Sequence, residues 1–201
     1  RGINFNSKSL LFKVFFIIRG KLIGFIINNS EKMIFCNLIN IFYPKKSKIY
    51  YKDTFYMKDI ENVGTITYPN KRILRIVHHE DLLKRIYETY CLHHLEFSNG
   101  DIVIDCGANV GELYVSFLYN NINVDYIGIE PDSKTFECLT KNAKGEDNKF
   151  FKTALSNKIG KKEFYLDNYG GNSSLEKFDN VNSTTLHTNT IDNIDLPTKI
   201  K

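Results

Sequence analysis

Between Asp101 and Ala143 the sequence twice alternates a short β-branched run with a helical pattern. The expected elements are strands at 101–106, 124–129 and 150–155, and helices at 112–118 and 132–143. Strands that alternate with helices form parallel β/α units with right-handed crossovers. The alternation therefore predicts an α/β fold built on a doubly wound, Rossmann-like sheet.

The sequence before this alternation predicts an N-terminal extension. Ser9 to Ile41 is mostly apolar and fits one or two helices, and Pro44 with its neighbouring lysines predicts a linker. Short alternating runs between Lys48 and Val77 predict a small β unit, and Glu80 to Leu95 predicts a helix. We therefore expect an extension over 1–80 and a main domain over 81–201.

Charge divides the chain into two halves. Residues 1–100 have 16 Lys/Arg and 8 Asp/Glu, whereas residues 101–201 have 11 and 15. A basic front half can bind nucleic acid, an anionic membrane surface or an acidic partner. No nucleic-acid-binding signature accompanies it, so we expect a solvated basic surface. A non-catalytic binding module for nucleic acid or membrane surfaces remains the alternative from another functional class.

Membrane, disulfide and metal patterns are weak. Lys13, Arg19 and Lys21 interrupt the apolar run from Leu10 to Ile27, so we expect no transmembrane segment. The four cysteines lie far apart with no CxxC pair, which predicts free thiols in a reducing, cytoplasmic compartment. The pairs His78-His79 and His93-His94 lack converging carboxylates, so no metal site is predicted.

The turn after the first core strand is the strongest candidate for a ligand site. Open α/β sheets bind ligands beyond the carboxyl ends of their strands. Gly107 and Gly111 would let a ligand approach the backbone, and the turn's N–H groups would favour a carboxylate. A dinucleotide motif would need glycine where Asn109 and Glu112 stand, so a nicotinamide-dependent oxidoreductase fits poorly, although it remains a second enzymatic alternative.

Two acidic residues predict the charge of the ligand. Asp105 ends the first strand, where it would repel phosphate but attract an ammonium or sulfonium group. Glu130 ends the second strand, where its carboxylate can accept hydrogen bonds from both hydroxyls of a ribose. Together they predict one cationic nucleoside as the ligand.

Three motifs carry a resemblance to a known family. They are Gly100-Asp-Ile-Val-Ile-Asp-Cys-Gly-Ala-Asn-Val-Gly-Glu112, Ile129-Glu-Pro-Asp132 and Lys141-Asn-Ala143. This pattern resembles the FkbM family of methyltransferases. The stretches 153–165 and 170–175 are also similar to what that family has after its third strand, so the resemblance covers about residue 88 to the end.

The resemblance implies a partial class I methyltransferase fold that binds S-adenosyl-L-methionine. The implied cofactor-binding residues are Asp105, Gly107, Ala108, Asn109, Gly111, Glu130, Pro131 and Ala154. Glu130 would bind the ribose, Ala154 would approach the adenine, and Ser173-Ser174 would line the acceptor side. The implied acceptor is a hydroxyl of a sugar or another small molecule. Family members continue into a fourth strand with a D-V-E-G-A-E-type motif, so we expect this chain to be the front part of the domain. Neither a catalytic base nor an oligomeric state is predicted.

Overall fold

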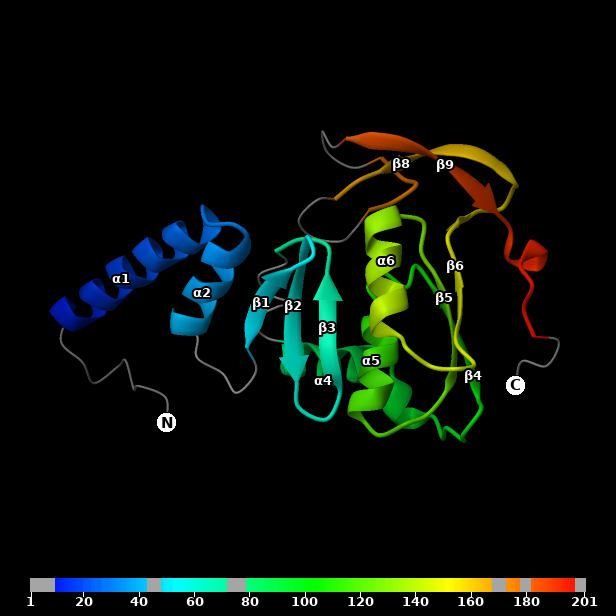
Figure 1. The fold of residues 1–201 in the computed structure, drawn as a ribbon, viewed down its shortest axis with the longest axis horizontal. Coiled ribbons are helices and arrows are strands. Elements are labelled where there is room, and N and C mark those ends of the chain that lie inside the picture. The colour runs from blue at the N-terminus through cyan, green and yellow to red at the C-terminus, as the bar shows by residue number, and fades with distance from the viewer. Residues whose placement is uncertain (1–9, 43–47, 72–78, 168–172, 178–181, 198–201) are drawn as a thin grey trace.

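The structure, a computed structural model, describes residues 10–42, 48–71, 79–167, 173–177 and 182–197. Within them the chain is a mixture of helices and three small sheets, which confirms a mixed α/β composition. The sheets have the strand orders β1-β2-β3, β4-β5-β6 and β7-β9-β8. Figure 1 shows α1 at the N-terminal end, the first sheet in the middle, the second sheet to its right and the third sheet at the top.

The predicted extension consists of two helices and an antiparallel sheet. The helices are α1 (Leu10–Asn28) and α2 (Lys32–Phe42), and the strands are β1 (Ile49–Lys52), β2 (Phe55–Ile60) and β3 (Gly64–Tyr68). β1 pairs with β2 and β2 with β3. The predicted strand residues 72–77 and most of the predicted linker lie outside the described residues.

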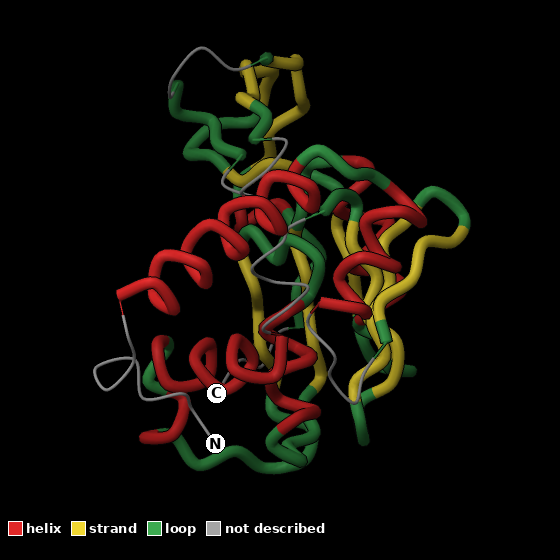
Figure 2. The backbone as a smooth tube through the Cα atoms, turned by 90° about the vertical axis from the view of Figure 1, so that its left-hand side faces the viewer, coloured by secondary structure: helices red, strands yellow, loops and turns green. Residues whose placement is uncertain are grey.

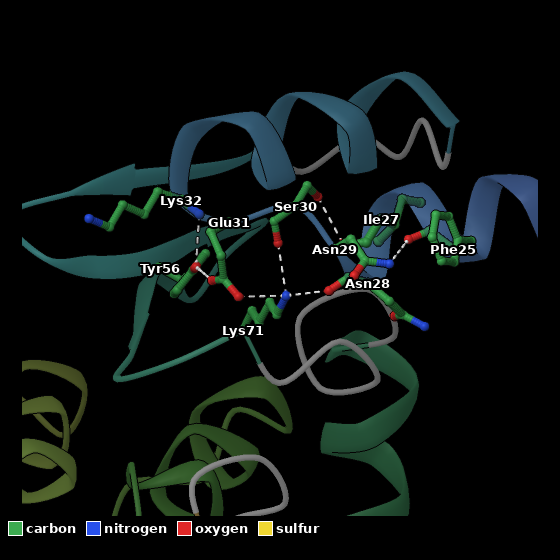
Figure 3. A network of polar contacts seen from close by, with 9 residues as sticks. All are labelled: Phe25, Ile27, Asn28, Asn29, Ser30, Glu31, Lys32, Tyr56 and Lys71. Atoms are coloured by element: carbon green, nitrogen blue, oxygen red, sulfur yellow. Dashed lines mark hydrogen bonds and ion pairs between the residues drawn. The ribbon is translucent and has the colours of Figure 1, made fainter.

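A group of polar contacts fastens the α1–α2 turn to this sheet (Figure 3). The Lys71 ammonium group donates to the backbone oxygens of Asn28 and Ser30, at 2.7 and 2.8 Å, and lies 2.6 Å from the Glu31 carboxylate. The Tyr56 hydroxyl on β2 also donates to Glu31, at 2.8 Å. We call Glu31, Tyr56 and Lys71 the clamp.

The parallel sheet follows, and its strands alternate with helices as predicted. Its elements are α4 (His79–Thr89), a 3-10 turn η2 (Leu92–His94), β4 (Ile102–Cys106), α5 (Glu112–Tyr119), β5 (Asp125–Ile129), α6 (Ser133–Asn142) and β6 (Lys149–Phe151). β5 pairs in parallel with β4 on one side and with β6 on the other. Figure 1 shows α5 and α6 between this sheet and β1-β2-β3. The described residues place helices on only one side of the sheet, so the doubly wound methyltransferase sheet stays a prediction.

The single strand predicted over 150–155 is divided between two sheets. β6 ends at Phe151, and β7 (Ala154–Leu155) pairs with β9 (Ser183–Asn189) instead of β5. β9 also pairs with β8 (Gly160–Tyr165), and the 3-10 turn η3 (Ile191–Asn193) follows. A continuous apolar run does not reveal where the chain leaves one sheet for another, because that depends on a partner strand about thirty residues later. Figures 1 and 2 show this third sheet at one end of the molecule.

The core joins the extension to the parallel unit. One apolar cluster includes Phe35 of α2, Tyr68 of β3, Val115 of α5 and Cys138 of α6, all at most 1% exposed. Asn142 reinforces this contact, since its side chain hydrogen-bonds both backbone groups of Thr67. Residues on both sides of the predicted boundary at residue 80 therefore share one core.

Candidate functional site

A cavity of about 320 Å³ lies where β4 and β5 end and the third sheet begins. Small-molecule sites in proteins have volumes of about 300–1,000 Å³. The lining residues are Cys106, Gly107, Asn109, Ile129, Glu130, Pro131, Asp132, Thr135, Thr153, Ala154, Leu155, Phe164, Ser173, Ser174 and Leu175. The cavity therefore lies at the carboxyl ends of parallel strands, as the sequence predicts.

The turn between β4 and α5 has an unusual backbone. Gly107, Asn109 and Gly111 have φ angles of 90°, 52° and 82°, which are in the left-handed region that favours glycine and asparagine. A Cβ added to Gly107 would meet no atom within 4 Å, so the turn is open there. A Cβ on Gly111 would instead lie 3.0 Å from the Leu139 side chain. The two glycines thus have different roles: Gly107 faces open space, and Gly111 permits close packing of α6.

The N–H groups of this turn are used within the protein. The N–H groups of Gly107 and Ala108 donate to the backbone oxygen of Ile129 at 2.9 and 3.0 Å. The N–H group of Gly111 donates to the backbone oxygen of Ala108 at 2.8 Å. The Asn109 N–H donates to the Glu130 carboxylate at 2.9 Å. This corrects the expectation that these amides are directed at a ligand carboxylate, because neighbouring β5 supplies acceptors that the sequence does not reveal.

Glu130 is a buried carboxylate in the wall of the cavity. Glu130 directly follows β5 and is only 7% exposed. One carboxylate oxygen accepts the Asn109 N–H and the other accepts the Asp132 N–H, each at 2.9 Å. Two backbone donors therefore fix the orientation of the carboxylate. Carboxylate oxygens can each accept more than one hydrogen bond, so the same group can also bind hydroxyls.

Asp105 faces a different neighbour. Its carboxylate accepts a short hydrogen bond from the hydroxyl of Tyr126, a fully buried residue of β5. Burial raises the pKa of Asp105 and outweighs the hydrogen bond from Tyr126, which lowers it, so the net pKa is raised. Burial, followed by the charge of Asp105, also raises the pKa of Tyr126 well above its usual range, so the phenol stays protonated and remains a donor. The chain next to Asp105, at Cys106 and Gly107, reaches the cavity wall.

The predicted cofactor residues fall into two groups. Those that line the cavity are Gly107, Asn109, Glu130, Pro131 and Ala154. Those that are not among its lining residues are Asp105, Ala108 and Gly111. Ala108 and Gly111 hydrogen-bond to each other within the turn, and Asp105 accepts a hydrogen bond from Tyr126. The structure therefore brings one of the two predicted carboxylates to the cavity wall.

Several lining residues have no signal in the sequence reasoning above. Phe164 is 4% exposed, and it lies in β8, a strand whose other residues are mostly polar. Thr135 lies in the first turn of α6, where its N–H donates to the Asp132 side chain at 2.8 Å.

Ser173 and Ser174, expected on the acceptor side, do line the cavity, and a β-bridge between Ser174 and Tyr165 holds them against β8. Residues 170–172 of the same motif lie outside the described residues.

The charge of the cavity wall is negative. Glu130 and Asp132 are the two carboxylates, and the described lining residues include no Lys or Arg. A cation is therefore favoured there and a phosphate disfavoured. Within the described part of the chain, no group of three His, Cys, Asp or Glu side chains is arranged to hold a metal ion.

No protein-family model, curated protein or solved structure matches this chain. A functional proposal for this chain therefore rests on the geometry and charge of the cavity.

Proposed function

We propose that this chain forms the cofactor-binding part of an S-adenosylmethionine-dependent methyltransferase of the FkbM type. The observation that carries the proposal is the buried Glu130 carboxylate, oriented by two backbone N–H groups in the wall of a ligand-sized cavity. A rigidly held carboxylate after the second strand of a parallel β/α unit suits the two hydroxyls of a ribose. Gly107 offers an open approach for the methionine part, and Ala154 offers a small apolar surface for the adenine.

Charge favours this cofactor over a nicotinamide dinucleotide. S-adenosylmethionine has a sulfonium and an ammonium group, whereas a dinucleotide has a pyrophosphate. Glu130 and Asp132 in the wall attract the former and repel the latter.

The acceptor that we propose is a hydroxyl of a sugar or another small molecule. Ser173 and Ser174 are small polar residues in the same cavity wall, and their hydroxyls can donate to and accept from a hydroxylated acceptor. Methyl transfer from a sulfonium is a direct displacement, so alignment of sulfur, methyl and acceptor oxygen can supply about 7–11 kcal/mol of its acceleration. We assign no general base.

Thermal unfolding with added nucleotides tests the proposal. S-adenosylmethionine and S-adenosylhomocysteine should each raise the Tm in a saturable way, since a ligand at about a hundred times its Kd stabilises the fold by about 2.7 kcal/mol. NAD⁺ should leave the Tm unchanged. Calorimetric titration of the full chain should then give a Kd. If neither sulfur nucleoside gives heat or a Tm shift, the proposal is wrong.

A matched pair of variants assigns the binding to Glu130. Glu130→Gln should weaken binding by about tenfold or more, because a hydrogen bond to a charged group is worth about 1.5–3 kcal/mol. Glu137→Gln alters an exposed carboxylate of α6 that pairs with Lys141, and it should bind normally. Circular dichroism of both variants separates loss of binding from loss of fold. Equal affinity for both folded variants would show that Glu130 does not bind the cofactor.

A further inference from the structure

Helix α1 presents an apolar face to solvent. Large hydrophobic side chains at spacings of three and four residues lie on one face of a helix. In α1 the exposed members of such a series are Leu11, Val14, Phe15, Ile18, Leu22 and Phe25, which we call the apolar stripe. Leu11 is 83% exposed and Phe25 is 67% exposed. Monomeric soluble proteins rarely leave such a contiguous apolar surface uncovered unless it binds a partner or a membrane.

The opposite face of α1 already supplies its contact with the fold. Ile27 is 3% exposed and belongs to the core cluster, and Ile23 packs against that cluster. Figure 1 shows α1 reaching from this contact toward the N-terminal end, away from the sheets. The clamp in Figure 3 holds the turn at the base of α1 against β2. The apolar stripe is therefore a surface displayed by the fold.

The charges of α1 identify what this surface fits. Its only charged side chains are Lys13, Arg19 and Lys21, and residues 1–30 include five Lys/Arg and no Asp/Glu. A rotation of about 100° per residue places Arg19 at one edge of the apolar stripe and Lys21 at the other, and the exposed Leu10 and Ile17 continue the apolar surface beyond Lys21. An exposed apolar helix whose charged side chains are all cations suits the headgroup region of an anionic bilayer. Within the described part of the chain, no helix meets the length and hydropathy that a membrane span requires.

We propose that α1 docks the protein on an anionic phospholipid surface. The helix lies parallel to the bilayer plane, with the apolar stripe inserted among the acyl chains and Arg19 and Lys21 beside phosphate and carboxylate headgroups. The clamp transmits this orientation to the sheets. This docking is independent of the proposed methyl transfer and needs no nucleotide.

Vesicle flotation with the full chain tests the docking. The protein should float with vesicles of phosphatidylcholine and phosphatidylserine, and only weakly with phosphatidylcholine alone. Binding should fall as salt rises, because salt screens the attraction of cations to anionic headgroups. Absence of flotation with the anionic vesicles overturns the proposal.

Two variants separate the apolar and ionic contributions. Phe15→Glu should lower partition into both vesicle types by about tenfold or more, because it places a charge in the apolar stripe. The double change Arg19→Gln with Lys21→Gln should lower partition into anionic vesicles by about tenfold or more and leave neutral vesicles unaffected. Ile159→Glu, at an isoleucine that is 65% exposed beside β8, is the matched control and should bind normally.

Sedimentation velocity distinguishes the rival occupant. All variants change exposed positions, so far-UV circular dichroism should match the unsubstituted protein. If the protein instead forms a dimer that Phe15→Glu dissociates, and if no variant alters flotation, the apolar stripe binds a second copy and the membrane proposal is wrong. Equal flotation of Phe15→Glu and Ile159→Glu overturns it in the same way.

Discussion

The Tyr126 hydroxyl on β5 donates a hydrogen bond to the Asp105 carboxylate at the end of β4. The bond joins two neighbouring strands directly beneath the turn that contributes Gly107 to the cavity. Tyr126 itself is fully buried against Tyr114 of α5, with ring centroids 5.2 Å apart. The pair thus couples the packing of α5 to the position of the turn.

Tyr126→Phe should destabilise the fold in a pH-dependent way. The variant removes the donor that lowers the pKa of Asp105, so this pKa, already raised by burial, should rise further. An acid with a raised folded-state pKa stabilises the fold at low pH and loses this contribution as the pH rises through that pKa. The loss relative to the unsubstituted protein should be about 1–3 kcal/mol at pH 7 and smaller at pH 4.

Urea unfolding at the two pH values checks this prediction. Tyr119→Phe, which removes a hydroxyl from a partly exposed tyrosine at the end of α5, is the matched control and should cost little at either pH. A loss for Tyr126→Phe that is the same at pH 4 and pH 7 would show that the hydroxyl does not stabilise the ionised carboxylate.

Gly111→Ala should cost stability. Alanine is strained at a φ of 82°, and its Cβ would lie 3.0 Å from Leu139 Cδ1 and 3.6 Å from the Ala143 Cβ. Backbone strain and overpacking of α6 should together cost about 2–4 kcal/mol in urea unfolding. Gly100→Ala is the matched control, since Gly100 has the same φ but no atom within 4 Å of an added Cβ. A loss no larger than that of the control would contradict close packing at Gly111.

Gly107→Ala should instead affect the cavity. Its φ of 90° adds strain similar to that at Gly100, and an added Cβ meets no protein atom within 4 Å. The methyl group would therefore point into open space beside the cavity wall. We expect a stability loss of about 1–2 kcal/mol, like that of Gly100→Ala, but weaker binding of S-adenosylhomocysteine only for Gly107→Ala. Unfolding curves and calorimetric titration measure the two effects separately.

Asn142→Ala should weaken the contact between α6 and the antiparallel sheet. The side-chain oxygen accepts the Thr67 N–H at 2.7 Å, and the amide group donates to the Thr67 and Val110 oxygens, each at 2.8 Å. Alanine would leave three buried backbone groups without these partners, at a cost of about 3 kcal/mol or more in urea unfolding. Asn120→Ala removes one hydrogen bond, from the exposed residue that caps α5 to the backbone oxygen of Ser116, and should cost less than about 1 kcal/mol. Similar losses for both variants would contradict this role of Asn142.

The clamp should make stability fall as the pH drops below 4.5. Burial raises the pKa of Glu31, but hydrogen bonds from Lys71 and Tyr56 outweigh it, and the net pKa is lowered. An acid with a lowered folded-state pKa stabilises the fold above its ordinary pKa of 4.5 and loses this contribution as the pH falls through the folded value. Because the Glu31 side chain is 60% exposed, the effect should be below about 1 kcal/mol.

Tyr56 should add a loss at the alkaline end. Burial is the main reason that its pKa rises to about 12, so the fold keeps this contribution below pH 10 and loses it as the pH rises toward 12. Thermal unfolding across pH with Lys71→Met and Tyr56→Phe measures both ends. Lys71→Met should flatten the acid limb, and Tyr56→Phe should flatten the alkaline limb. Unchanged limbs would mean that the clamp does not couple to pH.

The elements around the site were largely predictable from the sequence. β4, β5 and α6 lie within a residue or two of the predicted ranges, because β-branched runs and helical spacing are local signals. The turn after β4 was also predictable, since glycine at 107 and 111 permits the left-handed backbone found there.

The orientation of Asp105 was not predictable in the same way. Whether a strand-end carboxylate meets a ligand or a buried phenol depends on the residue that the neighbouring strand places beside it. Tyr126 lies 21 residues away in sequence, and only the parallel register of β4 and β5 brings it to Asp105. The division of the 150–155 run between two sheets was missed for a similar reason.

The sequence by itself determined the alternation of strands and helices, the glycine turn and the acidic residue after each of two strands, because these depend on local backbone preferences and side-chain spacing. Only the tertiary structure decided that Glu130 lines the cavity while Asp105 bonds Tyr126, and that the apolar stripe of α1 faces solvent. Burial and partnership are set by contacts between segments far apart in the chain. Such contacts become defined only once the sheets and helices have packed.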